Sequence, residues 1–227
     1  RIKEDYLRIL RFFRFIAELD LNYESVEKNY LEVISLYKDN LDIISKERVS
    51  SELKRIFLSV DPTVSLEFLE KTKIYKKFLG SFNKKRVKRL IFFEKKYNLF
   101  PMLERRLLSL SIKSSGYILS RKEQKYYGIL KEYLGKMRNL KYLGFILGFE
   151  KALDCLIINA VRNDLKIIDE ELNFLKEGSK KVFPLTFSYI NEKFNNEVTA
   201  REKLDYLKNI WVQSDFKISK NNLIKYL

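Results

Sequence analysis

The sequence has 227 residues, and 45 lysines and arginines against 30 aspartates and glutamates give it a formal net charge of +15. It contains no histidine, a single cysteine (Cys155), seven glycines and three prolines. These counts exclude catalytic triads, histidine-based acid–base chemistry, disulfide frameworks and most zinc sites, and so few turn residues argue against β-sandwiches and barrels. The charge favours a polyanionic partner, either a nucleic acid or an anionic membrane surface.

Apolar residues recur at helical spacing along the whole chain, beginning with Leu7, Leu10, Phe13 and Ala17 in a helix expected over 4–19. Further helices are expected over 24–38, 45–58, 62–70, 120–136, 139–162 and 166–177. A short helix is expected after Leu185, then a helix that carries Trp211, and a last short one from Ser219. Ser120 and Glu123 fit a capping box, and Gly178 is expected to end the helix before it. The pattern predicts an all-α fold, an elongated array of about ten to twelve helices.

The longest uncharged runs in the most apolar region are too short to span a membrane. Tyr142–Phe149 and Cys155–Val161 fall well below the 18 or so residues that a span requires. No signal-peptide pattern opens the chain, which begins at Arg1 rather than Met. The sequence therefore predicts a cytoplasmic protein without a membrane partner, and a piece of a longer chain.

Asp5 and Arg8 are the most informative pair of residues. At helical spacing of three they present a carboxylate acceptor beside a guanidinium donor. Cytosine and adenine offer an amino donor beside a ring-nitrogen acceptor, which matches such a pair, whereas guanine and uracil offer a carbonyl beside an N–H. The pair is thus able to accept C and A and reject G and U. The alternative is an ordinary helix salt bridge.

Three stretches resemble one family. Arg1–Phe15 (RIKEDYLRILRFFRF) resembles the motif that follows the catalytic domain in bacterial tRNA nucleotidyltransferases, which are the CCA-adding enzymes and the similar bacterial poly(A) polymerases. Residues 44–53 (ISKERVSSEL) are similar to a second helix of that family. Phe183–Leu185 and Trp211–Phe216 resemble the tail of some members.

The resemblance implies roles for particular residues. Asp5 and Arg8 would be the template that selects CTP and ATP, Glu4 would anchor the template helix, and Arg11 would lie near the bound nucleotide. The residues of the second motif that would brace the template helix are Glu47, Arg48 and Glu52. For these three, a solvated salt-bridged helix face is the alternative.

The family's catalytic head carries a Gly-Ser phosphate loop and a pair of aspartates that hold two Mg²⁺ ions. Gly80-Ser81 has no acidic pair after it, and the carboxylates of Glu18 and Asp20 diverge on a helix. We therefore expect no catalytic residue and no metal site in this chain, with Mg²⁺ only in the missing head. The chain alone should be inactive.

The middle of the chain is its most basic part. Its cations are expected to follow the phosphates of the tRNA acceptor stem and elbow, without reading sequence. They are Lys84, Lys85, Arg86, Lys88, Arg89, Lys95, Lys96, Arg105 and Arg106. Neighbouring tyrosines, with core packing as the alternative for each, are candidates for base stacking; they are Tyr75, Tyr97, Tyr126 and Tyr127.

Together these features predict the neck, body and tail of a CCA-adding tRNA nucleotidyltransferase. The expected domains are a neck with the template helix over 1–60, a basic body over 61–136 and a tail over 137–227. A poly(A) polymerase of the same family is the first alternative, because both enzymes use ATP. A non-catalytic basic helical RNA-binding module is the second.

Overall fold

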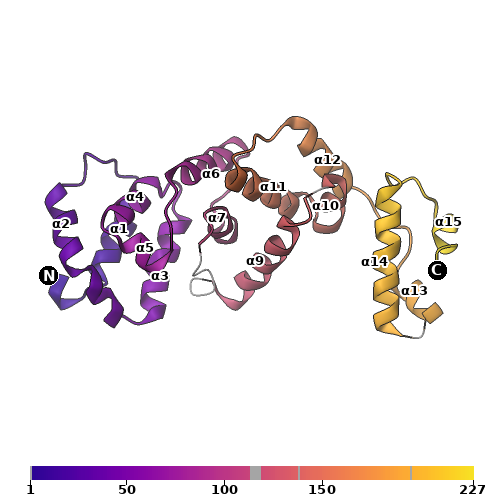
Figure 1. The fold of residues 1–227 in the computed structure, drawn as a ribbon, viewed down its shortest axis with the longest axis horizontal. Coiled ribbons are helices and arrows are strands. Elements are labelled where there is room, and N and C mark those ends of the chain that lie inside the picture. The colour runs from indigo at the N-terminus through magenta and orange to yellow at the C-terminus, as the bar shows by residue number, and fades with distance from the viewer. Residues whose placement is uncertain (1, 113–118, 138, 195) are drawn as a thin grey trace. The chain divides into compact units, whose positions relative to one another are not determined.

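The computed structural model describes residues 2–112, 119–137, 139–194 and 196–227. Within these ranges it contains fourteen α-helices, twelve of them with seven or more residues, and no strand (Figure 1). The predicted all-α class is confirmed. In chain order the elements are η1 (Ile2–Glu4), α1 (Arg8–Glu18), α2 (Lys28–Tyr37), η2 (Lys38–Ile43), α3 (Lys46–Leu58), α4 (Thr63–Lys71), α5 (Ile74–Phe78), α6 (Lys84–Lys96), α7 (Leu103–Ser109), α9 (Arg121–Leu134), α10 (Leu140–Leu147), α11 (Phe149–Asn163), α12 (Asp169–Ser179), α13 (Phe187–Phe194), α14 (Glu197–Gln213) and α15 (Lys220–Ile224).

The chain divides into two compact units. The first comprises Arg1–Gly135 and Asp154–Ile167, and the second comprises Lys136–Leu153 and Ile168–Leu227, so that the division falls within α11.

In the first unit, α1 packs against α3 and α4. The two apolar stripes of α1 bury Ile9, Leu10 and Phe13, which is why this helix contacts neighbours on more than one side. The Ser65 hydroxyl of α4 donates a hydrogen bond to the Phe13 carbonyl at 2.7 Å. This packing fixes the start of α1, where Asp5 and Arg8 lie, on a buried framework.

The second unit contains a very close helix crossing between α10 and α12. A Cβ atom added at Gly144 would lie 2.2 Å from the Leu175 carbonyl oxygen, and one added at Gly178 would lie 1.9 Å from that of Lys141. Only glycine lets the two backbones approach so closely. Gly178 therefore serves the packing of α12 and lies inside the helix, so the prediction that it ends the helix was wrong.

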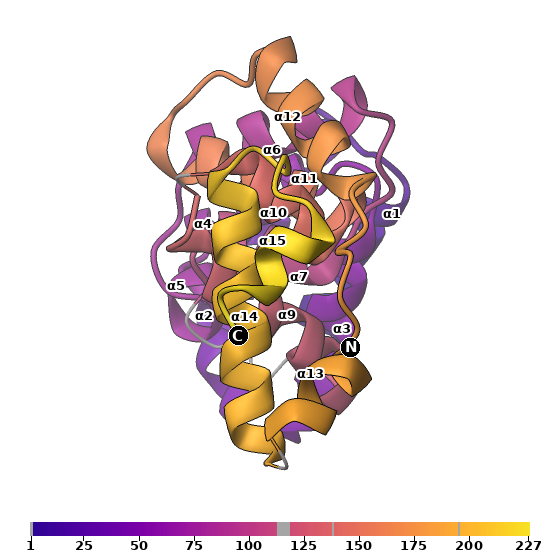
Figure 2. The same cartoon turned by 90° about the vertical axis from the view of Figure 1, so that its right-hand side faces the viewer.

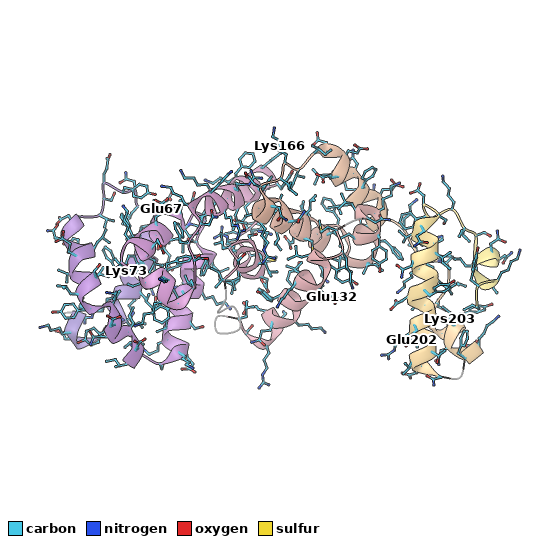
Figure 3. All side chains as sticks on the ribbon, viewed as in Figure 1. Glu67, Lys73, Glu132, Lys166, Glu202 and Lys203 are labelled. Atoms are coloured by element: carbon cyan, nitrogen blue, oxygen red, sulfur yellow. The ribbon has the colours of Figure 1, made fainter. Side chains whose placement is uncertain are left out.

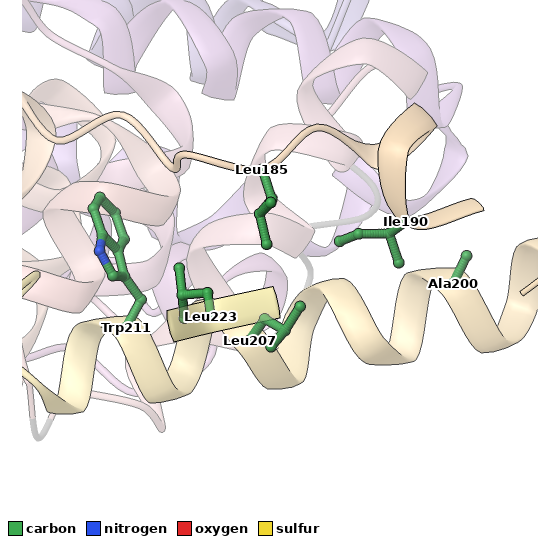
Figure 4. Packing of buried hydrophobic residues seen from close by; sticks show 6 residues of the cluster. All are labelled: Leu185, Ile190, Ala200, Leu207, Trp211 and Leu223. Atoms are coloured by element: carbon green, nitrogen blue, oxygen red, sulfur yellow. The ribbon is translucent and has the colours of Figure 1, made fainter. Parts of the chain in front are cut away.

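The last three helices enclose a separate apolar cluster, shown in Figure 4. Its buried members are Leu185, Ile190, Ala200, Leu207, Trp211 and Leu223. Figure 2 shows α15, which carries Leu223, lying across α14. The Trp211 ring contacts Phe183 at 5.4 Å and Phe216 at 4.9 Å between centroids, so the third matching stretch of the sequence comes together here.

Two other helix boundaries differ from the prediction. The helix expected over 139–162 is broken at Gly148, whose φ of +76° belongs to a region that glycine adopts readily, so α10 and α11 are separate helices. The first helix begins at Arg8 rather than near Glu4, because Asp5 forms a turn instead. The capping box of Ser120 and Glu123 at the start of α9 is confirmed.

Candidate functional site

Asp5 lies in the turn that leads from η1 into α1. Its Oδ1 accepts a hydrogen bond from the Leu7 N–H at 3.1 Å, and its carbonyl accepts one from the Arg8 N–H at 3.1 Å. A short acidic side chain commonly bonds to the backbone two residues on in this way, in place of a helical turn. The carboxylate is thus held at the entrance to α1.

The second oxygen of Asp5 faces α3. Its Oδ2 accepts a hydrogen bond from Arg48 Nη2 at 2.9 Å and lies 3.8 Å from Arg11 Nη1. Desolvation alone would raise the pKa of Asp5, but the Leu7 N–H and the guanidinium groups of Arg48 and Arg11 outweigh it and lower that pKa. Asp5 is therefore an ionised acceptor at neutral pH, and two of the predicted motifs meet at its side chain.

Arg8 is paired with Glu4 rather than with Asp5. The Arg8 Nη2 atom lies 3.1 Å from Glu4 Oε2, and both side chains are largely exposed. Arg8 also lines a pocket of about 240 Å³ whose other walls are apolar. These walls are Ile2, Ile9, Phe12, Tyr30, Val33 and Ile34. Phe12 and Tyr30 beside the guanidinium were not singled out from the sequence, where they look like ordinary members of an apolar helix face.

Glu52 joins α3 to α1 from a buried position. It accepts hydrogen bonds from Arg14 Nη1 at 2.8 Å and from Arg11 Nε at 3.4 Å. Arg14 is itself buried and also lies 3.3 Å from Glu18. Arg48 and Glu52 thus contact the segment that carries Asp5, whereas Glu47 is exposed and pairs with no side chain that the structure describes.

Several of the predicted tRNA-binding cations of α6 have partners inside the protein. Lys84 donates to Glu67 at 2.8 Å, and Lys95 lies 3.4 Å from Asp61. On the opposite side of α6, three cations hold the segment that ends α11. Lys85 and Arg89 pair with Asp164, and Arg86 donates to the Arg162 carbonyl at 3.1 Å and to Ser111 Oγ at 3.0 Å.

Lys88 and Lys96 are different, because they are exposed and neither forms an ion pair with the residues described. Lys88 lies with Lys84, Lys95 and Phe92 along a groove of about 480 Å³. Phe92 is 58% exposed, whereas its neighbours Ile91 and Phe93 are buried.

Arg105 and Arg106 are buried, with exposed fractions of 3% and 1%. Arg105 lies 3.0 Å from Glu94 and 2.7 Å from Asp154, and Arg106 lies 2.6 Å from Glu94. Arg106 also donates to the carbonyls of Phe57, Ser59 and Val60. Both guanidinium groups are buried and bonded to groups inside the protein, so the expectation that they lie along tRNA phosphates was wrong.

The four tyrosines considered for stacking are placed mainly by the fold. Tyr75 is buried against Phe82, and Tyr97 stacks on Phe93 at 6.2 Å. Tyr126 donates its hydroxyl hydrogen bond to Asp154 at 2.9 Å. Tyr127 is half-buried. Core packing therefore describes Tyr75, the alternative that the sequence left open.

Charged side chains project from both units, as Figure 3 shows with Glu132 and Lys203 among the labelled residues. Among the residues described, no group of three or more histidine, cysteine, aspartate or glutamate side chains is placed to hold a metal ion. No described helix is both long enough and apolar enough to cross a membrane.

A family model and several solved structures match the chain. The model described as "Probable RNA and SrmB- binding site of polymerase A" matches residues 25–85. The CCA-adding enzyme of Thermotoga maritima complexed with tRNA_CCA is similar over 99% of this chain and 61% of its own, with 14% identity and a TM-score of 0.59. A CCA-adding enzyme in complex with CTP matches over 99% and 59%, with 14% identity and a TM-score of 0.55. No curated protein sequence matches.

The chain has the fold of the CCA-adding enzymes. The resemblance to the tRNA nucleotidyltransferase and poly(A) polymerase family is thereby confirmed. The chain spans about three fifths of the length of these solved enzymes. The segment that matches the RNA-binding model includes α3, with Arg48 and Glu52, and ends with Lys84 and Lys85 of α6.

Proposed function

We propose that this chain is the nucleotide-selecting and tRNA-binding part of a CCA-adding tRNA nucleotidyltransferase. The observation that carries the proposal is the ionised Asp5 carboxylate, which Arg48 and Arg11 hold at the start of the helix that carries Arg8. Solved enzymes of the same fold have been captured with tRNA and with CTP. On this proposal CTP and ATP are the substrates, and Mg²⁺ is bound by a catalytic head outside this chain, without which the chain does not turn over.

Asp5 and Arg8 keep enough hydrogen-bonding capacity to act as a template. A carboxylate accepts about four hydrogen bonds. Asp5 accepts one from the Leu7 N–H and one from Arg48, while Arg11 lies 3.8 Å away as an ion-pair partner. Arg8 has about five donors and, among the residues that the structure describes, forms an ion pair with Glu4 alone. Acceptor capacity on Asp5 and several donors on Arg8 therefore remain for a base, in the combination that matches cytosine and adenine.

The apolar pocket beside Arg8 supports the same proposal. A base that meets Arg8 with its polar edge has Phe12 and Tyr30 within the same pocket to cover its faces. Aromatic side chains and bases stack favourably whatever the base, so the pocket supplies affinity while Asp5 and Arg8 supply selectivity.

The tRNA-binding surface on this proposal lies on the exposed side of α6. Lys88 and Lys96, which form no ion pair with a described residue, are its cations, and Phe92 is its exposed aromatic side chain; Lys84 and Lys95 line the same groove but are paired with Glu67 and Asp61. Such contacts fix the position of an RNA without reading its sequence. They suit the acceptor stem and elbow, which tRNAs share.

A poly(A) polymerase is the second candidate, and the description of the matching family model favours it. Asp5 and Arg8 accept adenine in either enzyme. The two candidates differ in CTP use, so competition between CTP and ATP in the enzyme with its catalytic head distinguishes them. A basic RNA-binding module without catalysis binds RNA but shows no selectivity among nucleotides.

The proposal is tested by measuring the affinity of CTP, ATP, GTP and UTP for the chain with a catalytic head supplied in trans. The wild type should bind CTP and ATP in preference to GTP and UTP. Asp5→Ala should lose about 1.5–3 kcal/mol of that preference, roughly 10- to 150-fold, because a hydrogen bond to a charged group is lost. Asp39→Ala, which removes an exposed carboxylate paired with Lys77, is the matched control. Equal binding of all four nucleotides, unchanged by Asp5→Ala, would contradict the template role.

A further inference from the structure

The solvent-facing side of α9 carries cations that have no counter-ion among the residues that the structure describes. Arg121, Lys122 and Lys125 are exposed, and none of them forms an ion pair with a described residue. Glu123, the acidic residue between them, points to Lys54 of α3 instead. Arg121 and Lys122 lie in the first turn, where cations oppose the helix dipole, so the stability of α9 does not explain these two.

Gly128 lies on the same side of α9, opposite the buried Leu130. A Cβ atom added there would have no atom within 4 Å, and the backbone does not adopt a positive φ. Packing therefore does not require a glycine at this position, in contrast to Gly144 and Gly178. Glycine destabilises an exposed helix interior relative to alanine, and no contact in the described fold requires it at this position. Departures of this kind from local preference are expected at functional sites.

We propose that this side of α9, formed by Arg121, Lys122, Lys125 and Gly128, binds the phosphodiester backbone of helical RNA. The inference rests on the proposed function and adds a second RNA-binding surface to it. Uncompensated cations at helical spacing match the repeated phosphates of a duplex, and the missing side chain at Gly128 lets the ribose-phosphate chain approach the helix. Glu132, one turn beyond Gly128, limits the contact to the first two turns of α9.

The test is the affinity of the purified chain for a fluorescent RNA hairpin, measured over a series of salt concentrations. Gly128→Ala should raise the melting temperature by about 2–4 °C, because alanine favours the helix. It should nevertheless weaken RNA binding about fivefold or more, because its methyl group occupies the closest approach. Lys125→Ala should lower the slope of log affinity against log salt by about 1.

Gly135→Ala is the matched control. Gly135 follows the last residue of α9, is exposed, and would place a Cβ no closer than 3.9 Å to another atom. This variant should leave RNA affinity unchanged. A polyglutamate peptide serves as the second probe, because an acidic protein is the rival occupant of a cationic helix face.

Each outcome decides something. If Gly128→Ala stabilises the chain and leaves RNA affinity unchanged, or if it destabilises the chain, the inference about α9 fails. If Gly128→Ala or Lys125→Ala weakens the binding of polyglutamate but leaves RNA binding unchanged, the surface is assigned to an acidic protein, and the inference is also overturned. If the wild-type chain does not bind RNA, the proposed function itself is contradicted. If the wild type binds RNA and neither Gly128→Ala nor Lys125→Ala changes that binding, only the inference about α9 is contradicted.

Discussion

Arg106 should be needed for folding rather than for binding RNA. Its guanidinium group lies at the junction of α7, α6 and the end of α3, where it donates to Glu94 and to the carbonyls of Phe57, Ser59 and Val60. Arg106→Ala removes all of these donors at once. Three carbonyl oxygens lose a donor, and Arg105 is then the one cation among the described residues that still pairs with Glu94.

The expected cost is large. Breaking a buried ion pair by removing one partner costs about 3–5 kcal/mol. Each buried carbonyl left without a partner adds to this, although such terms do not sum simply. Because a native protein is stable by only about 5–15 kcal/mol, the variant should be close to unfolding. At roughly 2–4 °C per kcal/mol for a chain of this size, the melting temperature should fall by about 6–20 °C.

The assay combines thermal unfolding, followed by circular dichroism, with the salt dependence of RNA binding. Arg106→Lys keeps the charge but not the fork of donors, so it should lie between the wild type and Arg106→Ala. Lys88→Ala is the contrasting variant: its stability should change by less than about 0.5 kcal/mol, while its salt slope should fall by about 1. If Arg106→Ala melted like the wild type and lowered the salt slope instead, the structural role assigned to Arg106 would be refuted.

Three further predictions concern other parts of the chain. Gly178→Ala should lower the free energy of unfolding by more than the roughly 1–3 kcal/mol that is usual for overpacking, because its Cβ would overlap the Lys141 carbonyl of α10. Unfolding followed by near-ultraviolet circular dichroism checks this, and unchanged unfolding would contradict the close crossing. Cys155 should resist iodoacetamide in the folded chain and react in urea, because desolvation raises the pKa of its thiol to about 12; rapid alkylation of the native chain would count against its burial. Asp61 is partly desolvated, which raises its pKa, but its hydrogen bonds from Thr63 and the charge of Lys95 outweigh this and lower the pKa below 3.8. Its stabilising contribution is therefore complete above 3.8 and lost as the pH falls through the lower folded value, so Asp61→Asn should flatten the acid limb of stability against pH in urea titrations.

The fold class and several local features followed from the sequence because each has a short-range cause. Helical spacing of apolar residues and the scarcity of turn residues predicted the all-α class, and the side-chain chemistry of Ser120 and Glu123 predicted the start of α9. The break at Gly148 was missed because an apolar run gives the same pattern with or without an interruption. Gly178 was misassigned because a glycine that ends a helix and one that admits a neighbouring backbone look alike in sequence.

The candidate site was predictable only in part. The two motifs identified Asp5, Arg48 and Glu52, and the structure brings these side chains to α1, but their roles in nucleotide selection stay predictions. The sequence did not indicate that Arg8 pairs with Glu4 while Asp5 pairs with Arg48, because partner choice depends on how α3 lies against α1. Contacts between segments some 40 residues apart are decided by packing rather than by local pattern.

The basic middle of the chain shows why charge density in a sequence overestimates a binding surface. A signal for the burial of Arg106 was present: Glu94 falls in the stripe of α6 that also carries Val87, Leu90 and Ile91, so a buried carboxylate there required a buried cation. A cation that neutralises such a group holds the fold together and has little left to offer a phosphate. The cations proposed to bind RNA are instead those that form no ion pair with a described residue, such as Lys88 on α6 and Lys125 on α9. Substituting the first kind should change the free energy of unfolding, and substituting the second should change the salt dependence of binding.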